Sequence, residues 1–304
     1  MDGETSVWKT GPFWLLMVVL ALVAALIFMG VRYRDATVGM EFVPKVMARK
    51  TAVLSALRIR MIKSVDLEKS AVMADTDEAS IAFAEKSVRE AEAVEQDLRE
   101  LSQLVEAYPS EKEVKLLQEF NGCWTEFRSI DQAVLGFAVQ NSNLKAARFS
   151  FAATRDAMVL FEDALAKLMR EQEAGPICGL ASQALAAALK IQILHAPHIA
   201  APNDEEMDGL EKNIQENDAL VRRSLNALQP LVSTDLQFTF RQAEAAYHEF
   251  SDVTTKIIEL SRQNTNIKSF ELSLNRKRNI TSQCEEILTS LGDAVQSRSF
   301  KATR

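Results

Sequence analysis

The sequence predicts an all-α protein, in which an N-terminal transmembrane helix is followed by two tandem up-down-up-down four-helix bundles. Three observations support this: one uncharged apolar run, long stretches of helical periodicity, and an internal repeat. The composition agrees, because the 304 residues include only 10 Gly and 7 Pro and are rich in Ala, Leu, Glu, Lys, Arg and Gln. Such residues favour helices over strands.

The apolar run at 12–31 contains no charged residue. A helix that rises about 1.5 Å per residue covers roughly 30 Å over this length, which matches the hydrocarbon core of a bilayer. Aromatic and basic residues that suit the two membrane interfaces lie at or near the ends of the run: Trp8, Trp14, Arg32, Tyr33 and Arg34. We therefore expect an N-terminal tail at 1–11 and a transmembrane anchor at 12–34.

A cleaved secretory signal is the alternative interpretation of this run. The run is longer than the usual apolar region of a signal peptide, about 7–15 residues, and no small-residue cleavage site follows promptly. The sequence therefore favours an uncleaved, single-pass anchor, with the lipid bilayer as one partner of the protein.

The charge distribution argues against one class of partner. Residues 1–35 carry three acids and three bases, so the formal net charge of −7 belongs to the rest of the chain. Nucleic-acid binding requires a basic stripe, and none is evident in the sequence. More bases follow the anchor than precede it, which by itself would place the body in the cytoplasm, but long translocated domains obey this rule poorly.

The three cysteines, Cys123, Cys178 and Cys284, are widely separated in the sequence. Their spacing fits no zinc or haem-attachment motif, and their odd number argues against a disulfide framework. We therefore interpret them as small buried hydrophobic residues.

Four helices are expected in the first half of the body, because apolar residues recur there at helical spacing. The expected helices lie at about 43–74, 81–105, 114–137 and 144–168. Ser110 and Glu113 form a capping box at the start of the third helix. In the fourth helix the apolar residues alternate by three and four, which is typical of the seam of an antiparallel bundle.

The second half of the body repeats the first. The segment 140–168 is identical at nine of 29 positions to the segment 263–291, which follows 123 residues later. The identities include polar residues of the break at 140–143 as well as apolar seam positions. Segments of the first two helices match at an offset of 127 residues, and a loop can absorb the difference.

This repeat predicts a tandem duplication. We expect bundle one at 40–172, bundle two at 176–298, and a short C-terminal tail at 299–304. Gly175-Pro176, between the two copies, is the candidate hinge.

Four features of the chain are similar to one known family. They are the anchor that leads into a long first helix with Ala56-Leu57-Arg58-Ile59-Arg60, the first turn at 68–80, the spacing of Phe120, Trp124 and Phe127, and the Asn-x-Asn-x-Lys-Ala turn at 141–146. On these residues the chain resembles the four-helix-bundle sensor domain of methyl-accepting chemotaxis proteins. The resemblance covers nearly all of 12–298, once per repeat.

This resemblance implies a sensor for signal transduction and chemotaxis, anchored in the cytoplasmic membrane with a periplasmic body. Chemoreceptors of this kind continue through a second transmembrane helix into a methylated signalling hairpin. This sequence ends at Ser297–Arg304 without a second apolar run. We therefore expect either a lone sensor that works through a partner signalling protein, or a truncated receptor.

No enzymatic motif is evident, because the sequence lacks a Gly-rich phosphate loop, a nucleophile elbow and a clustered Ser/His/Asp set. We expect neither catalysis nor a cofactor. His195 and His198 are the candidates for a metal site, since they lie three residues apart. Pro197 lies between them, however, and histidines near a helix C-terminus commonly interact with the helix dipole instead.

Four arginines of bundle one are the candidate ligand site: Arg58, Arg60, Arg148 and Arg155. In the predicted antiparallel packing, Arg60 of the first helix lies near the level of Arg155 in the fourth. The resemblance implies that arginines between these two helices hold a small carboxylate, which a guanidinium binds bidentately. The alternative is a solvated network of ion pairs with Asp66, Glu68, Asp156 and Glu162.

Two further interpretations stay open. A structural adaptor that docks partner helices would show a continuous exposed apolar stripe, whereas a sensor would show a polar-lined pocket between helices. The first helix carries apolar residues on more than one face, Leu54, Ile59 and Ile62 among them. This pattern predicts a homodimer, because a helix that is apolar beyond one stripe needs a second burial surface.

Overall fold

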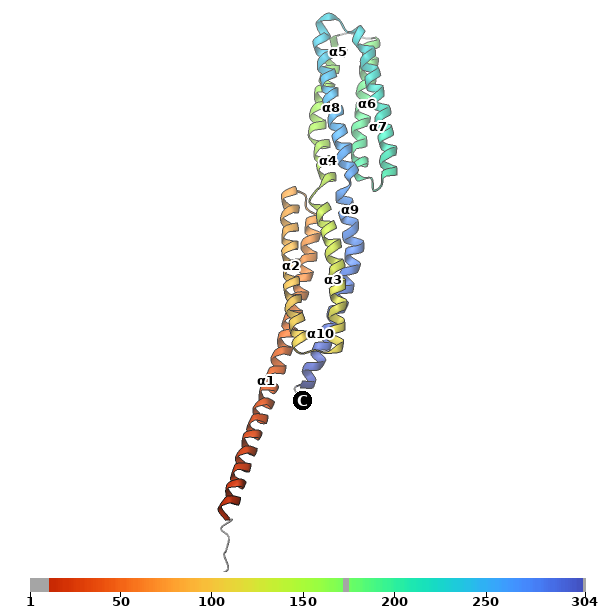
Figure 1. Ribbon diagram of the computed structural model, residues 1–304. Coiled ribbons are helices and arrows are strands. Elements are labelled where there is room, and N and C mark those ends of the chain that lie inside the picture. Colours follow the sequence, from red (N-terminus) through yellow and green to blue (C-terminus); the bar gives the residue numbers. More distant parts are fainter. Residues whose placement is uncertain (1–10, 172–174, 303–304) are drawn as a thin grey trace, which may run out of the picture. The chain divides into compact units, whose positions relative to one another are not determined.

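The protein is helical throughout the part that the structure describes, residues 11–171 and 175–302 of a computed structural model (Figure 1). No strand occurs in these ranges, so the predicted all-α class is confirmed. The main helices are α1 (Gly11–Val72), α2 (Asp77–Ala107), α3 (Glu111–Ala138), α4 (Ser142–Phe151), α5 (Ala153–Glu171), α6 (Pro176–Ala200), α7 (Asp204–Leu228), α8 (Gln237–Gln263), α9 (Thr265–Leu272) and α10 (Arg278–Ala302). Two 3₁₀ turns, Gln229–Leu231 and Thr234–Leu236, precede α8, and a π-helical turn, Ser273–Lys277, joins α9 to α10. The predicted tail at 1–11, with Trp8, lies outside the described residues apart from Gly11.

Local sequence signals decide some helix ends, and packing decides others. Asn203 caps α7, because its Oδ1 accepts a hydrogen bond of 2.9 Å from the backbone N–H of Glu206. At the capping box predicted for α3, the Glu113 carboxylate is instead fully buried. It accepts hydrogen bonds from Lys50 Nζ at 2.6 Å and from Arg298 Nη1 at 2.9 Å. A buried ion network thus uses the carboxylate that would otherwise cap the helix.

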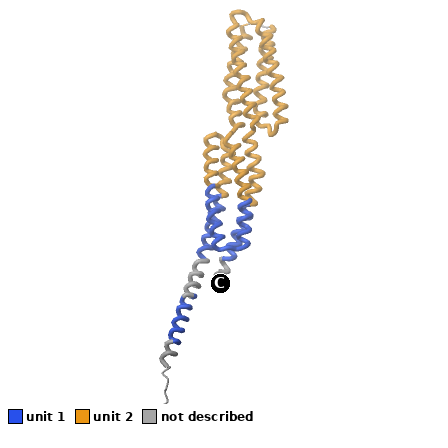
Figure 2. Tube along the Cα trace, viewed as in Figure 1, with its two compact units in different colours: residues 1–60, 92–122, 284–304 blue, residues 61–91, 123–283 orange. Residues whose placement is uncertain are grey.

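The chain divides into two compact units, which Figure 2 shows in different colours. Unit 1 comprises 1–60, 92–122 and 284–304, and unit 2 comprises 61–91 and 123–283. Helices α1, α2, α3 and α10 contribute segments to both units. In unit 1 these segments supply a core of buried apolar side chains that includes Leu57, Leu101, Phe120 and Leu291.

One apolar core of unit 2 is built by α5, α6, α7 and α8. Its fully buried members include Phe161 and Leu165 of α5, Ala184 and Ala188 of α6, Val221 of α7 and Phe250 of α8. The helix predicted to close the first bundle therefore shares its core with the first three helices of the second. The predicted bundles at 40–172 and 176–298 do not match this packing.

The other part of unit 2 is closed by the last helix of the second repeat. The hydroxyl of Ser87 in α2 donates to the backbone carbonyl of Ser64 in α1 at 2.8 Å. Lys277 Nζ, in the π turn, donates to Asp131 Oδ1 of α3 at 2.5 Å. Each repeat thus contributes its last helix to the other repeat. In Figure 1 the exchange is visible as the paths from α3 into α4–α5 and from α8 into α9–α10.

The exchange takes place at two kinks of nearly equal geometry. Asn141 separates α3 from α4, and Asn264 separates α8 from α9. Both are left-handed, with φ of 49° and 52°, a conformation that asparagine adopts more readily than most residues. The break predicted at 140–143 is therefore a kink between two nearly continuous helices rather than a loop that reverses the chain.

The two kinks contact each other through reciprocal hydrogen bonds within unit 2. The Ser142 backbone N–H donates to Thr265 Oγ1 at 3.0 Å, and the Thr265 backbone N–H donates to Ser142 Oγ at 3.1 Å. Asn143 and Asn266 make the same exchange, from backbone N–H to side-chain Oδ1, at 3.1 and 3.2 Å. The partners are equivalent positions of the two repeats, so the junction has approximate twofold symmetry.

One described helix, α6, is long and apolar enough to cross a membrane by length and composition alone. A core helix of a globular protein passes the same test, and one face of α6, with Ala181, Ala188 and Ile191, is buried in unit 2. The predicted anchor at 12–34 contains a shorter apolar stretch of α1, Met17–Gly30, whose side chains are exposed. Its function as a membrane anchor stays a prediction.

The cysteines differ in state. Cys123 and Cys284 are buried and disulfide-bonded, whereas Cys178 is a free thiol. The interpretation of all three as isolated small hydrophobic residues is therefore wrong for two of them. Disulfides persist in oxidising compartments such as the periplasm and are rare in the cytosol.

Candidate functional site

The four arginines predicted to hold a ligand are divided between the two units. Arg58 and Arg60 belong to unit 1, whereas Arg148 and Arg155 belong to unit 2. The physical reason is the exchange of the last helices. In unit 1 the place beside α1 is taken by α10, so Arg58 Nη2 donates to Thr289 Oγ1 of α10 at 2.8 Å.

Each of the other three arginines has a partner of its own. Arg60 pairs with Asp97 at 3.3 Å, Arg148 donates to the backbone carbonyl of Asp75 at 2.8 Å, and Arg155 pairs with Asp156 at 3.2 Å. The Arg155 and Asp156 side chains are mostly exposed, where an ion pair contributes little to stability. These contacts fit the alternative of solvated ion pairs.

His195 and His198, the candidates for a metal site, are fully buried in α6. His195 contacts the hydroxyl of Ser150 in α4 at 3.3 Å and that of Thr254 in α8 at 3.2 Å. Burial, with a smaller contribution from His198, lowers the pKa of His195 to about 4, so the imidazole is neutral at pH 7. Within 11–171 and 175–302, no group of three or more His, Cys, Asp or Glu side chains is arranged to hold a metal ion.

His198 belongs to a second polar chain. Its Nδ1 lies 2.9 Å from Ser261 Oγ, and its Nε2 lies 3.0 Å from Glu211 Oε1. Arg262 Nε donates to the same carboxylate oxygen at 2.6 Å. The hydrogen bond from Arg262 lowers the pKa of Glu211, so this carboxylate is ionised.

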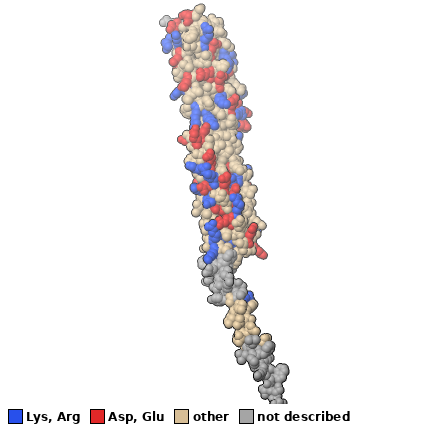
Figure 3. Space-filling view, turned by 60° about the vertical axis from the view of Figure 1, so that its left-hand side comes forward, with Lys and Arg blue, Asp and Glu red and all other residues tan. Residues whose placement is uncertain are grey.

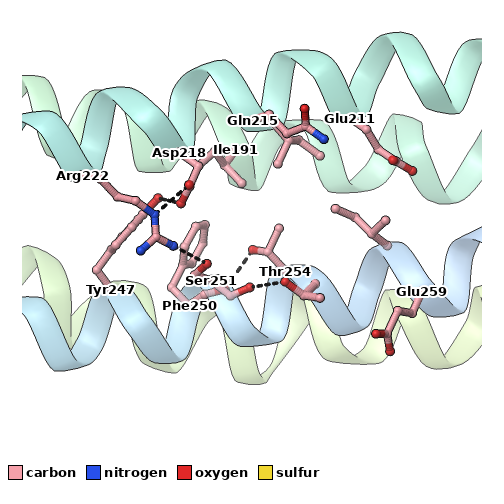
Figure 4. A pocket seen from close by; sticks show the side chains of 13 residues that line it. Ile191, Glu211, Gln215, Asp218, Arg222, Tyr247, Phe250, Ser251, Thr254 and Glu259 are labelled. Atoms are coloured by element: carbon pink, nitrogen blue, oxygen red, sulfur yellow. Dashed lines mark hydrogen bonds and ion pairs between the residues drawn. The ribbon is translucent and has the colours of Figure 1, made fainter.

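A cleft lies next to the hydrogen-bonded groups of both histidines. Thr254, a partner of His195, and Glu211, a partner of His198, line it. Its volume is about 430 Å³, which suits a small organic molecule. Ile191 of α6, Ile214 of α7 and Phe250 of α8 form its apolar lining. Figure 4 shows the lining side chains entering the space between the helices.

At the polar end of the cleft, hydrogen bonds connect α7 to α8. The Tyr247 hydroxyl donates to Asp218 Oδ1 at 2.7 Å, and Arg222 Nε donates to Asp218 Oδ2 at 2.8 Å. Arg222 Nη2 also donates to Ser251 Oγ at 3.1 Å. Burial, together with the hydrogen bond to Asp218, raises the pKa of Tyr247, so its hydroxyl stays protonated. These contacts hold Arg222 across the gap, as Figure 4 shows.

The arrangement can bind a small polar molecule that has an apolar portion. The Arg222 side chain remains 53% exposed, so its guanidinium is accessible to a carboxylate or another anion. Ser251 and Thr255 add hydroxyl oxygens on α8. Ile258 offers a partly exposed apolar surface beside these polar groups, whereas Phe250 and Ile214 are buried.

The equivalent place in the other repeat is filled by charged side chains. At the sequence offsets of 127 and 123, His195 corresponds to Glu68 and Thr254 corresponds to Asp131. Glu68 and Asp131 are fully buried, and Lys277, which pairs with Asp131, has 1% of its surface exposed. The region around His195 and Thr254, beside the open cleft, is therefore equivalent in the duplicated fold to the packed cluster of Glu68 and Asp131.

The sequence patterns do not single out Asp218, Arg222 or Tyr247. A trace of the site is present, since Tyr247 and Phe250 repeat the spacing of Trp124 and Phe127. An acid and a base at i and i+4 are common on helices without a site, however. The pairing of α7 with α8, which brings Tyr247 to Asp218, is needed to recognise it.

Acidic and basic side chains are interleaved on the face shown in Figure 3. This face carries no extended patch of a single sign. Its charges therefore do not indicate a particular partner.

Comparisons of the chain with models of protein families, with curated proteins and with solved structures found no match. The resemblance to chemoreceptor sensor domains stays an inference from the sequence motifs. The cleft between α7 and α8 is consequently the main guide to function.

Proposed function

We propose that the protein is a membrane-anchored sensor or ligand-binding protein whose ligand occupies the cleft between α7 and α8. The observation that carries this proposal is a space of about 430 Å³ that Arg222, Ser251 and Thr255 line together with apolar side chains of α6, α7 and α8. Ligand sites of helical bundles lie between helices and combine an apolar lining with a few directed polar groups.

The ligand that we propose for this site is a small amino acid or similar zwitterion, because three carboxylates line the cleft together with Arg222: Glu211, Asp218 and Glu259. Arg222 is already oriented by Asp218 and Ser251, so little side-chain freedom is lost when it binds an anion. A guanidinium binds a carboxylate through two parallel hydrogen bonds. Ile258 would contact an apolar portion of the ligand.

The proposed location is the cytoplasmic membrane, with one anchor at 12–34 and an extracytoplasmic body. The disulfide-bonded state of Cys123 and Cys284 favours an oxidising compartment for the body. The resemblance to chemoreceptor sensors implies the same orientation. The signal would then pass to a partner signalling protein or between two copies of the chain.

A ligand screen on the full chain in detergent tests this proposal. Small organic acids and amino acids are added, and the thermal unfolding midpoint is measured. A ligand at a hundredfold excess over its Kd stabilises the folded state by about 2.7 kcal/mol. We expect the shift to disappear in Arg222→Gln and to persist in Arg223→Gln, the exposed neighbour on α7.

The arginines predicted from the sequence provide the competing outcome. The double variant Arg60→Ala/Arg155→Ala should retain the shift. A shift that is lost in this double variant but kept in Arg222→Gln would move the site to the arginines. A library without any hit would favour an adaptor over a sensor.

The adaptor is the second candidate, and the outer face of α6 is the observation that favours it. Leu189 and Ile193 are 41% and 71% exposed, and Lys190 is the one Lys, Arg, Asp or Glu residue of this helix. A partner helix could cover this apolar face. If α6 docks a partner, Ile193→Glu should abolish its capture by cross-linking, and Arg222→Gln should leave it unchanged.

A further inference from the structure

A buried carboxylate lies in unit 2, where α1 meets the π turn of the last helix. Glu68 has no exposed surface, and neither of its carboxylate oxygens forms a hydrogen bond of normal geometry, although the Ser273 side chain lies close enough to lower its pKa. An ionised carboxylate without partners is strongly disfavoured away from water. This burial therefore favours the protonated, neutral form of Glu68.

The neighbouring charges are already paired with one another. Lys277 Nζ donates to Asp131 Oδ1 at 2.5 Å, with both side chains buried, and lies 3.3 Å from the centroid of the Phe127 ring. Arg128 Nη1 lies 3.3 Å from the other oxygen, Asp131 Oδ2. Lys277 and Arg128 thus share the Asp131 carboxylate. Glu68 is close enough to Lys277 and Asp131 to interact electrostatically with both, but it forms an ion pair with neither.

The backbone is irregular at the same place. Ser273–Lys277 forms a π-helical turn, and both end residues are buried, with 3% and 1% of their surface exposed. Such turns insert one residue into a helix and are frequent at functional sites. In the other repeat the fourth helix is also interrupted, at Ala152, where φ is −97° and ψ is −72°.

The two repeats share a further property at this position. His195, the counterpart of Glu68, is fully buried and held neutral by its surroundings. Each repeat therefore places a titratable side chain in the core, opposite an irregular turn of the fourth helix. The position that is filled by a neutral imidazole in one repeat is filled by a carboxyl group in the other.

We propose that Glu68 is a buried proton-binding switch that controls the position of Lys277 and the π turn. With Glu68 protonated, Lys277 binds Asp131 alone. When the proton leaves for solvent, the new carboxylate attracts Lys277, and the ammonium is shared between Glu68 and Asp131. The π turn then has two arrangements that differ by one proton.

The electrostatic surroundings support this switch. Burial raises the pKa of Glu68, while Ser273, Lys277 and Lys69 oppose the increase and Asp131 adds to it. Burial also lowers the pKa of Lys277, against the attraction of Asp131 and Glu68. Among the described residues, the charges that act on Glu68 or Lys277 are these two groups themselves and Lys69, Arg128 and Asp131, which lie on α1 and α3. The proposal does not depend on ligand binding in the cleft.

The sign of the pH dependence follows from the raised pKa. The folded state holds a proton that the unfolded state has lost, so this contribution to stability is present below the ordinary pKa of about 4.3. It is lost as pH rises through the folded-state pKa. Within that window, each pH unit lowers the folded-to-unfolded ratio about tenfold relative to Glu68→Gln, which cannot lose a proton.

Fluorescence of Trp124 gives a readout in the folded state. The Trp124 ring stacks on Phe127 at a centroid distance of 4.6 Å, and Phe127 contacts Lys277. The full chain with Trp8→Phe and Trp14→Phe, in detergent, is titrated upward from pH 4. We expect one transition above pH 4.3, and none in the same chain with Glu68→Gln.

Two controls separate the switch from general effects of pH. Asp66→Asn removes an exposed carboxylate two residues away on α1 and should leave the transition unchanged. Ser273→Ala should move the midpoint to higher pH, because Ser273 lowers the pKa of Glu68. If circular dichroism shows that Glu68→Gln does not fold, the shift in Ser273→Ala decides the question. A missing transition, a transition that persists in folded Glu68→Gln, or an unmoved midpoint in Ser273→Ala would overturn the proposal.

Discussion

Replacing His195 with Gln tests the buried polar chain beside the cleft. The imidazole contacts Ser150 on one side and Thr254 on the other, and Gln can still hydrogen-bond but cannot become a cation. Burial lowers the pKa of His195 from 6.5 to about 4. Wild-type stability from this residue is therefore complete above pH 6.5 and is lost as pH falls from 6.5 to about 4.

The size of this effect follows from the difference between the two pKa values. The difference, 6.5 − 4, is about 2.5 units, and each unit corresponds to about 1.4 kcal/mol. Wild type should lose about 3 kcal/mol relative to His195→Gln between pH 7 and pH 4. The free energy of unfolding is measured with urea on the full chain in detergent at a series of pH values.

An exposed histidine supplies the matched control. His248 on α8 has a 75% exposed side chain, so His248→Gln should follow the wild-type curve closely. A His195→Gln curve parallel to that of wild type throughout this range would refute the reasoning. Parallel curves would mean that His195 takes up its proton at the same pH in the folded and unfolded states, which contradicts a buried, neutral imidazole.

Three further predictions concern the fold. A protease that cuts within 171–175 should produce two fragments that co-elute in gel filtration, because α5 shares a core with α6 and α8; separated fragments would contradict the exchange of helices. Asn264→Gly should be more stable than Asn264→Ala by about 1 kcal/mol in thermal unfolding, because φ is 52° there; equal stabilities would argue against a left-handed kink. Sedimentation of the full chain in detergent should show a homodimer, because Ile59 and Ile62 are 65% and 42% exposed on α1; a strict monomer would reject this prediction.

Helices could be predicted from the sequence because their signal is local. Apolar spacing, caps and turn residues act within a few residues of one another. The α2 helix, for example, ends at Ala107, directly before the predicted break at Tyr108-Pro109. The duplication could also be predicted from the sequence, because the two repeats share identical residues at equivalent positions.

The exchange of the last helices could not be predicted in this way. Leu165 and Leu288 occupy equivalent seam positions, as do Leu168 and Leu291, so either fourth helix suits either set of three partners by pattern alone. Asn141 carries the sequence signal of a turn, but in the structure it only kinks the chain. The predicted arginine site depended on the opposite choice of partner helix, and it stays a prediction.

The cleft could not be predicted because its parts are separated in the chain. Tyr247 and Asp218 lie 29 residues apart and meet only through the packing of α8 against α7. The tyrosine looks like an ordinary core aromatic in the sequence. The volume beside it depends on small differences in side-chain packing that periodicity does not encode.

Hydrogen–deuterium exchange with a ligand from the screen tests the sensor assignment most directly. The full chain in detergent is compared with and without that ligand. Slower exchange is expected in the segments 211–222 of α7 and 247–259 of α8, which line the cleft. Protection confined to 51–60 of α1 and 288–296 of α10, with the cleft segments unchanged, would contradict a ligand site between α7 and α8.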